Sequence, residues 1–114
     1  MRLYKTLLAL ISAVGLVAAV PAIATASEGE FTYHYYDEDG EIQRGELEDP
    51  PSGVCVNIPE VIDFYDTYAF RPHNNTDSSA TVFRNGNCDG DAYYTLRPGG
   101  RASDRLLLRS VVFS

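Results

Sequence analysis

Residues 31–42, Phe-Thr-Tyr-His-Tyr-Tyr-Asp-Glu-Asp-Gly-Glu-Ile, decide the fold of this chain. Aromatic side chains at positions 31, 33 and 35 alternate with more polar ones, which is the period of a half-buried β-strand. Asp39-Gly40 is a preferred two-residue hairpin turn, and apolar residues return at Ile42 and Leu47. We therefore expect a β-hairpin here.

Short apolar segments recur through the rest of the chain, and clusters of Pro, Gly, Asn and Ser separate them. They predict further strands at residues 54–58, 68–71, 80–83, 92–96 and 110–113. Pro72 should stop the strand at 68–71, residues 74–79 should form a polar turn, and residues 60–66 could form one or two helical turns. Short strands at this spacing favour an all-β sandwich or barrel.

The amino-terminal segment predicts export. Arg2 and Lys5 precede an apolar run over residues 7–20, and residues 24–26, Ala-Thr-Ala, provide an Ala-x-Ala cleavage site. The run is shorter than the roughly 20 residues that a membrane span needs, and no second long apolar run follows it in the sequence. Residues 1–26 are predicted to be a signal peptide, and residues 27–114 a single secreted domain without a membrane anchor.

The cysteine count predicts a covalent link. A domain of about 88 residues is close to the size at which a hydrophobic core alone is marginally stable. Cys55 and Cys88 are the two cysteines, and an oxidising exterior allows this pair one intramolecular bridge. We predict a structural disulfide. A metal site is the alternative, but two cysteines at this separation, without nearby histidines, match no common zinc motif.

Charge is unevenly distributed along the predicted mature chain. Residues 27–66 hold twelve acidic side chains and one arginine, whereas residues 67–114 hold four acidic side chains and six arginines. Nucleic acid and anionic membranes are poor partners for such an acidic chain. The acidity fits a basic or cationic partner, and it also fits a soluble secreted domain whose two halves attract each other.

Three stretches resemble one Greek-key motif of the βγ-crystallin family: residues 82–90, Val-Phe-Arg-Asn-Gly-Asn-Cys-Asp-Gly, residues 96–99, Leu-Arg-Pro-Gly, and residues 109–113, Arg-Ser-Val-Val-Phe. In that family an aromatic strand leads to a glycine-bearing folded hairpin, and a serine precedes the last strand. The chain also resembles small secreted actinobacterial proteins with this fold, which include toxin-like proteins and a metalloproteinase inhibitor. The resemblance implies a small Greek-key β-sandwich with an extracellular binding or inhibitory role.

Calcium is the cofactor for which this sequence offers candidate ligands. The crystallin-type signature places two acidic or amide residues shortly before a Ser/Thr-Ser pair, whereas residues 107–109, Leu-Leu-Arg, precede Ser110, so that site is not carried over. Separately, Asp37, Asp39 and Glu46 fall on ligand positions of a calcium loop. A solvated acidic hairpin tip is the competing interpretation, because Asp-Gly is itself a turn sequence.

The sequence contains few candidate catalytic residues. His34 and His73 are the two histidines, and neither lies in a motif that pairs it with a nucleophile or a metal. No Gly-x-Ser-x-Gly, His-Glu-x-x-His or glycine-rich phosphate loop occurs in the sequence. We predict a non-enzymatic protein without catalytic residues.

Tyrosines provide the first candidate binding residues, since each combines a flat apolar face with a polar tip. Adjacent residues of a strand point to opposite faces. One member of the pair Tyr35 and Tyr36, and one of the pair Tyr93 and Tyr94, should therefore enter the core while the other faces outward. Tyr36 is our candidate for an outward binding residue, and coverage of a β-surface is the alternative role.

Arginines provide the second candidates. They recur at intervals of four at positions 97, 101, 105 and 109, where the sequence Pro-Gly-Gly at 98–100 prevents a continuous helix. Pairing with the acidic half of the chain is the expected role of these side chains, and Arg97 and Arg101 are the candidates for contacting a partner.

Two classes of function remain open. A secreted binding protein, of the inhibitor or toxin-like kind, would act on an extracellular protein or polysaccharide through a rigid exposed loop, for which residues 71–79 and 97–101 are candidates. A structural component of the cell surface would instead self-associate through tyrosine-rich strand edges.

Overall fold

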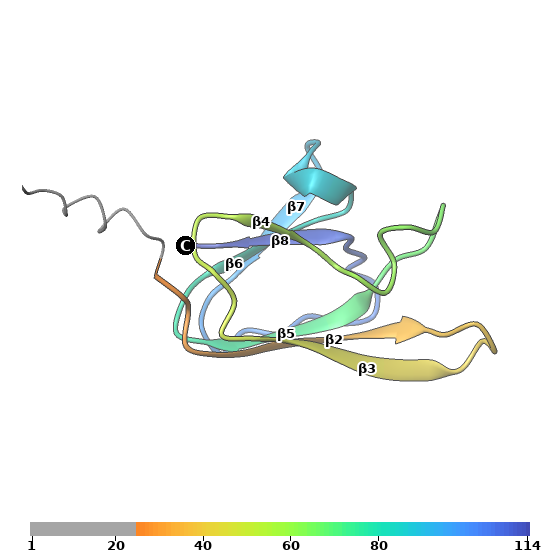
Figure 1. Cartoon of the computed structure of the whole chain (residues 1–114), viewed down its shortest axis with the longest axis horizontal. Helices are drawn as coiled ribbons and strands as arrows, with labels where there is room; N and C mark the ends of the chain where they lie inside the picture. The colour runs from red at the N-terminus through yellow and green to blue at the C-terminus, as the bar shows by residue number, and fades with distance from the viewer. Residues whose placement is uncertain (1–24) are drawn as a thin grey trace, which may run out of the picture.

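Two antiparallel β-sheets face each other in the computed structural model, which describes residues 25–114 (Figure 1). A three-stranded sheet has the order β3-β2-β5 and contains β2 (Gly29–Tyr36), β3 (Ile42–Glu48) and β5 (Phe70–Thr76). A four-stranded sheet has the order β4-β8-β6-β7 and contains β4 (Cys55–Asn57), β6 (Ala80–Phe83), β7 (Tyr93–Leu96) and β8 (Ser110–Phe113). The predicted all-β, sandwich-like class is confirmed.

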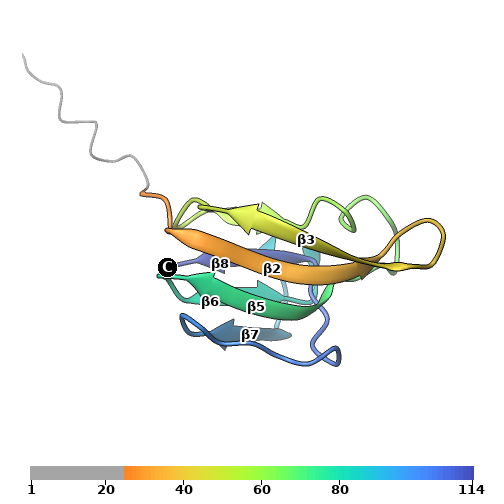
Figure 2. The same ribbon diagram turned by 90° about the horizontal axis from the view of Figure 1, so that it is seen from below.

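The predicted signal peptide, residues 1–26, lies outside the described residues except for its last two positions. Within residues 25–114 no helix is long and apolar enough to cross a membrane. Figure 2, seen from below, shows the three-stranded sheet in front of the four-stranded one.

The core lies between the two sheets. The rings of Phe31 from β2 and Phe113 from β8 meet edge to face with their centres 5.5 Å apart. Tyr33 is also fully buried, and its ring lies directly over Gly45 of β3, its partner across the sheet. A Cβ atom at position 45 would lie 2.5 Å from that ring. Glycine is therefore favoured at this position, because any side chain would have to displace the tyrosine ring.

The predicted hairpin is confirmed, although its turn is wider than the expected two residues. β2 pairs with β3 from Glu30↔Glu48 to Tyr36↔Ile42. The Asp37 N–H donates to the carbonyl of Glu41 at 2.9 Å, and the Gly40 N–H donates to the carbonyl of Asp37 at 3.0 Å. Gly40 has φ +78°, the left-handed conformation that a three-residue hairpin loop requires at this point.

β5 extends further than predicted. Pro72 does not stop the strand, and residues 74–76, which we expected in a turn, form its end. The strand lies at the edge of its sheet, where a residue without an N–H group is tolerated. Residues 97–102 cover the open edge, since the Asn74 N–H donates to Gly100 and the Ala102 N–H donates to Pro72.

Asn74 explains why a polar sequence belongs to this strand. Its side chain is fully buried, and its amide nitrogen donates to the carbonyls of Ser78, Leu96 and Arg97 at 2.7, 3.0 and 3.2 Å. Its amide oxygen accepts hydrogen bonds from the backbone N–H and the hydroxyl of Thr76. The Asn74 side chain thus has hydrogen-bond partners for both its nitrogen and its oxygen, as a buried polar group needs, and it joins the end of β5 to the end of β7.

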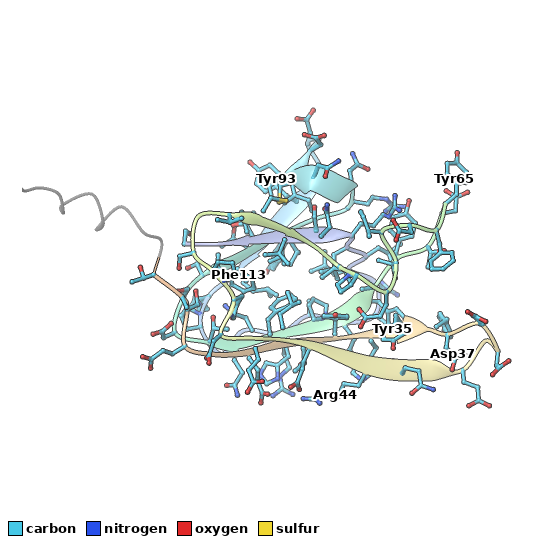
Figure 3. All side chains as sticks on the ribbon, in the orientation of Figure 1. Tyr35, Asp37, Arg44, Tyr65, Tyr93 and Phe113 are labelled. Atoms are coloured by element: carbon cyan, nitrogen blue, oxygen red, sulfur yellow. A yellow bond between two sulfur atoms is a disulfide. The ribbon has the colours of Figure 1, made fainter. Side chains whose placement is uncertain are left out.

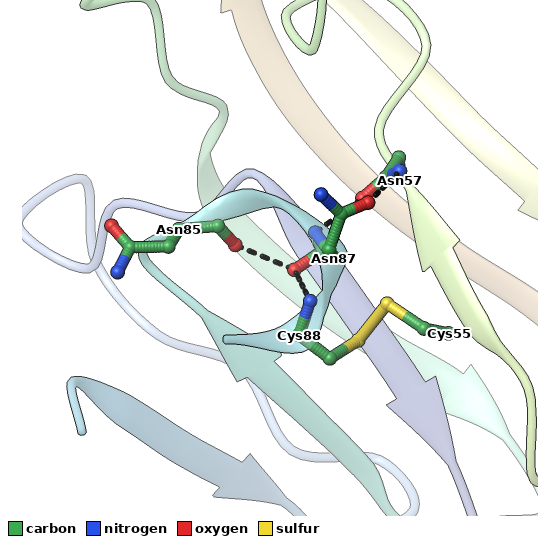
Figure 4. Close-up of a disulfide and its surroundings, with 6 residues drawn as sticks. Cys55, Asn57, Asn85, Asn87 and Cys88 are labelled. Atoms are coloured by element: carbon green, nitrogen blue, oxygen red, sulfur yellow. Dashed lines mark hydrogen bonds between the residues drawn. A yellow bond between two sulfur atoms is a disulfide. The ribbon is translucent and has the colours of Figure 1, made fainter. Parts of the chain in front are cut away.

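The predicted disulfide is confirmed. Cys55 at the start of β4 is bonded to Cys88 in the 3-10 turn η3 (Gly86–Cys88), with Cα atoms 6.0 Å apart (Figure 4). The Ser110 hydroxyl accepts the Cys88 N–H at 2.8 Å and donates to the carbonyl of Asn85 at 2.6 Å. The disulfide and the buried serine therefore hold the same folded loop from two sides.

The predicted division of the tyrosine pairs holds for one pair only. Tyr35 packs against the core and Tyr36 is 56% exposed. Tyr93 and Tyr94 are both exposed, at 62% and 54%. Tyr94 pairs across the sheet with the buried Val82, so it is on the core side, but β7 is an edge strand and the opposite sheet does not cover it.

Candidate functional site

A groove of about 320 Å³ lies where the β2–β3 hairpin meets the connection from β4 to β5, residues 58–69. We call it the aromatic–acidic groove. Its lining combines aromatic rings with carboxylates and consists of Tyr35, Tyr36, Asp37, Glu38, Glu60, Phe64 and Thr67. Its volume is at the small end of the roughly 300 to 1,000 Å³ typical of ligand pockets, which suits a single side chain of a partner.

A hydrogen bond joins the two walls of the groove. The buried Tyr33 hydroxyl of β2 donates to Glu60 Oε1 of the connection at 2.7 Å. Burial, followed by the hydrogen bond and charge of Glu60, raises the pKa of Tyr33 far above its usual range, so the hydroxyl stays a neutral donor. Glu60 therefore lines the groove as a carboxylate with one oxygen held by a hydrogen bond.

Arg109 binds the connection through its backbone carbonyls. Its Nη2 donates to the carbonyls of Val61, Ile62 and Phe64 at 3.2, 2.9 and 3.0 Å. Residues 60–66 form a run of turns without a regular helix. The Ile62 N–H donates to the carbonyl of Ile58, four residues earlier, as in a single helical turn. These charge-assisted bonds to carbonyls hold the connection in place together with its buried core residues Ile58 and Val61.

Two exposed aromatic side chains line the groove, and a third follows in the connection. Tyr36 and Phe64 are 56% and 55% exposed, and the adjacent Tyr65 is 90% exposed. Figure 3 shows Tyr35 between the sheets, Asp37 in the hairpin loop and Tyr65 at the outer end of the connection. Exposed rings of this kind are typical of contact surfaces, because a ring brings a large apolar area at little conformational cost.

Asp37 combines a structural role with a persistent charge. One of its oxygens accepts the N–H groups of Asp39 and Glu41, both at 2.9 Å, and the other accepts the amide of Gln43 at 2.9 Å. These hydrogen bonds, that of Glu41 first, lower the pKa of Asp37. The Asp37 carboxylate therefore keeps its negative charge to a lower pH than an aspartate without these hydrogen bonds.

The structure does not bring the three calcium candidates together. Asp37 and Asp39 lie in the hairpin loop, but Glu46 pairs with Thr32, four positions along β3 from Ile42. At about 3.3 Å per residue this places Glu46 roughly 13 Å from the end of the paired strands. Among residues 25–114, no group of three or more His, Cys, Asp or Glu side chains is placed to hold a metal ion.

The remaining candidates lie at three different places. Tyr36 lines the aromatic–acidic groove, as its outward position suggested. Arg101 lines a second hollow, of about 260 Å³, on the outer face of the three-stranded sheet. Arg97 is exposed and lines neither. Residues 71–79, expected as an exposed inhibitory loop, are mostly β5, and residues 97–101 are bonded along its edge, so neither segment protrudes freely.

The expected pairing of the late arginines with the acidic half is not found in the described part of the chain. Its two salt bridges join Arg44 to Glu46 at 3.5 Å and Arg71 to Asp104 at 3.6 Å. Arg109 instead caps backbone carbonyls, and the acidic residues of the groove take part in neither ion pair. The groove therefore presents carboxylate charge that these arginines do not neutralise.

Sequence reasoning missed Glu60, Phe64 and the role of Arg109. The segment 60–66 has no clear periodicity, and its position over the end of β2 depends on contacts between residues far apart in sequence. The available signal was Tyr33, a buried tyrosine that needs a hydrogen-bond partner.

Comparisons of the chain with protein-family models, with curated proteins and with solved structures found no match.

Proposed function

We propose that this chain is a non-enzymatic extracellular domain that binds a secreted partner protein by taking an arginine or lysine of a basic surface loop into the aromatic–acidic groove. The observation that carries the proposal is the meeting of exposed rings, Tyr36 and Phe64, with three carboxylates, Asp37, Glu38 and Glu60, around one concave surface. An aromatic face attracts a cation, and carboxylates accept hydrogen bonds from ammonium or guanidinium groups.

The rigidity of the groove supports this proposal. The Tyr33–Glu60 bond joins its walls, and Arg109 donates a hydrogen bond to the Phe64 carbonyl. A site that is already ordered loses less conformational entropy when a partner docks, and this is the usual requirement for an inhibitor or antagonist of small size. The disulfide and the leader sequence support export of the domain.

The test is an affinity measurement with a short Gly-Ser peptide that contains arginine and with its citrulline analogue, which keeps the shape of the side chain and removes the charge. We expect the arginine peptide to bind more tightly. Phe64→Leu should weaken binding about two- to fivefold, the effect of one exposed cation–π contact. Tyr93→Leu removes an exposed ring from the other sheet and should have no effect.

Two charge variants test whether carboxylates of the groove bind the peptide. Glu38→Gln, in the groove, should weaken binding, whereas Glu48→Gln, near the other end of the hairpin, should not. Equal binding of the citrulline peptide, or equal losses for Glu38→Gln and Glu48→Gln, would reduce the interaction to general attraction by an acidic protein and would contradict the proposal.

A Greek-key relationship to the βγ-crystallins is also part of our proposal. Its support is Ser110, the serine that precedes the last strand, which binds the glycine-bearing loop through Cys88 and Asn85. Asn85→Pro or Ser110→Ala should therefore loosen that loop and reduce the protection of its amides from hydrogen exchange.

Self-association is a second candidate function, favoured by the edge strand β7 with its exposed Tyr93 and Tyr94. Edge strands can pair with a second copy, and lysine on the edge prevents this. Sedimentation over a range of concentrations distinguishes the two. A dimer that Tyr94→Lys abolishes would favour this second function, and a monomer at all concentrations would exclude it.

A further inference from the structure

The outer face of the three-stranded sheet carries a second concave surface, which we call the basic hollow. It measures about 260 Å³, or roughly nine times the 30 Å³ that one water molecule occupies in the liquid. Both histidines of the chain and three of its arginines line it, together with two neighbours: Thr32, His34, Arg44, Arg71, Pro72, His73 and Arg101. No residue is shared with the aromatic–acidic groove.

The strand register assembles this cluster. Phe31 and Tyr33 face the core, so the alternate residues Thr32 and His34 face outward. His34 pairs with Arg44 on β3, and Thr32 pairs with His73 on β5. The open edge of β5 then brings in Arg101, because His73 forms a β-bridge with it. Four chain segments therefore converge on one face. Figure 3 shows Arg44 pointing away from the core on this side of the sheet.

A β-bulge adds Arg71 to the cluster. The pairing of β2 with β5 shifts by one residue between Thr32 and His34, opposite residues 71 and 72. Arg71 has φ +54°, a left-handed conformation that is unfavourable for a side chain of this size. Bulges re-aim side chains, and strained backbone concentrates at binding sites, so the bulge directs a guanidinium to the hollow at a cost in local stability.

The charge of the hollow contrasts with that of the protein. The chain has a net charge of −7, yet three guanidinium groups and two imidazoles line this one concave surface. Glu46 and Asp104 lie 3.5 and 3.6 Å from Arg44 and Arg71 in exposed, weak pairs, and Arg101 takes part in neither ion pair.

One atom of the hollow has an unmet requirement for a hydrogen bond. The Nδ1 atom of His34 is buried without a hydrogen-bond partner in the described part of the chain. A buried polar atom without a partner costs free energy, so this imidazole has hydrogen-bonding capacity that the described residues do not use.

We propose that the basic hollow binds a sulfate or phosphate group, free in solution or attached to a sugar chain. Guanidinium groups match the oxygens of such an oxyanion two at a time, and imidazole nitrogens donate single hydrogen bonds. Arg44, Arg71 and Arg101 line the hollow from three chain segments, so a bound anion has guanidinium groups of different segments as partners. Glu46 and Asp104 exchange their weak contacts for solvent when the anion enters.

The experiment follows the side-chain NMR signals of His34, His73 and the arginines in the full mature domain. Sodium sulfate, sodium phosphate, a sulfated oligosaccharide and its desulfated counterpart are titrated separately, with sodium chloride holding the ionic strength constant. We expect saturable shifts at His34 and His73. Arg44→Gln and Arg101→Gln should each weaken binding about tenfold, while Arg97→Gln, a matched change outside the hollow, should leave it unchanged.

The source of the anion follows from the same titrations. Saturation with the inorganic salts assigns the hollow to the free ion. Saturation with the sulfated oligosaccharide alone assigns it to a sugar-borne group. Either result supports the proposal if Arg44→Gln weakens binding and Arg97→Gln does not. Absence of saturation with all four compounds, or equal losses for Arg97→Gln and Arg101→Gln, would overturn it.

Discussion

Removal of the Cys55–Cys88 disulfide should cost a large part of the stability of this domain. The bridge joins residues 33 positions apart. The chain-entropy expression for a closed loop of that length gives about 12.5 cal/mol/K, or about 3.7 kcal/mol at 25 °C. Native small domains unfold at a cost of only about 5 to 15 kcal/mol, so the loss is a substantial share of the total.

The assay is denaturant and thermal unfolding of the double variant Cys55→Ala and Cys88→Ala beside the wild type. For a domain of this size each kcal/mol corresponds to about 4 to 8 °C, so the midpoint should fall by about 15 to 30 °C. If the double variant does not fold, reduction of the wild-type protein in mild denaturant measures the same quantity. A loss below about 1 kcal/mol would contradict this expectation and would mean that the open chain is already restricted to the same extent.

Three further predictions address the hairpin and its contact with Glu60. Gly45→Ala should destabilise the domain by about 1 to 3 kcal/mol in denaturant unfolding, because the new Cβ meets the Tyr33 ring, and a change below about 0.5 kcal/mol would contradict that packing. Tyr33→Phe should cost about 1 to 2 kcal/mol, since Glu60 loses its donor, and should broaden the amide signals of residues 58–69; unchanged stability and spectra would exclude the bond as a tie between the walls. The lowered pKa of Asp37 adds stability that is fully present above the pKa of the unfolded chain and is lost as the pH falls through the folded value. The protection of the hairpin-loop amides, measured as the exchange rate relative to that of an unstructured chain at the same pH, should therefore fall in that range, and Asp37→Asn should remove this pH dependence.

The sequence predicts the hairpin, four of the other strands and the disulfide, because each leaves a local signal: alternation, a turn dipeptide or a cysteine pair. The predicted bounds of the strand at residues 68–71 were wrong, because Pro72 and Asn74 have loop preferences that tertiary structure overrides. An edge position removes the penalty of the proline, and burial with five hydrogen-bonding groups satisfies the asparagine. Local propensity could not reveal either circumstance.

The candidate surfaces were predicted only in part for a related reason. Tyr36 and Arg101 could be singled out as residues, but their neighbours could not. Glu60 reaches the groove through a loop without periodicity, and Arg71 reaches the hollow through a bulge. Both arrangements depend on strand register, which a single sequence specifies poorly outside alternating segments.

The most direct test of the binding role is chemical-shift mapping of the isotope-labelled mature domain during titration with the arginine peptide, together with contacts between the arginine side chain and protein rings. We expect the largest shifts at residues 35–38 and 60–67 and direct contacts to Tyr36 and Phe64. Shifts spread evenly over the acidic residues 28–49, without contacts to either ring, would contradict it.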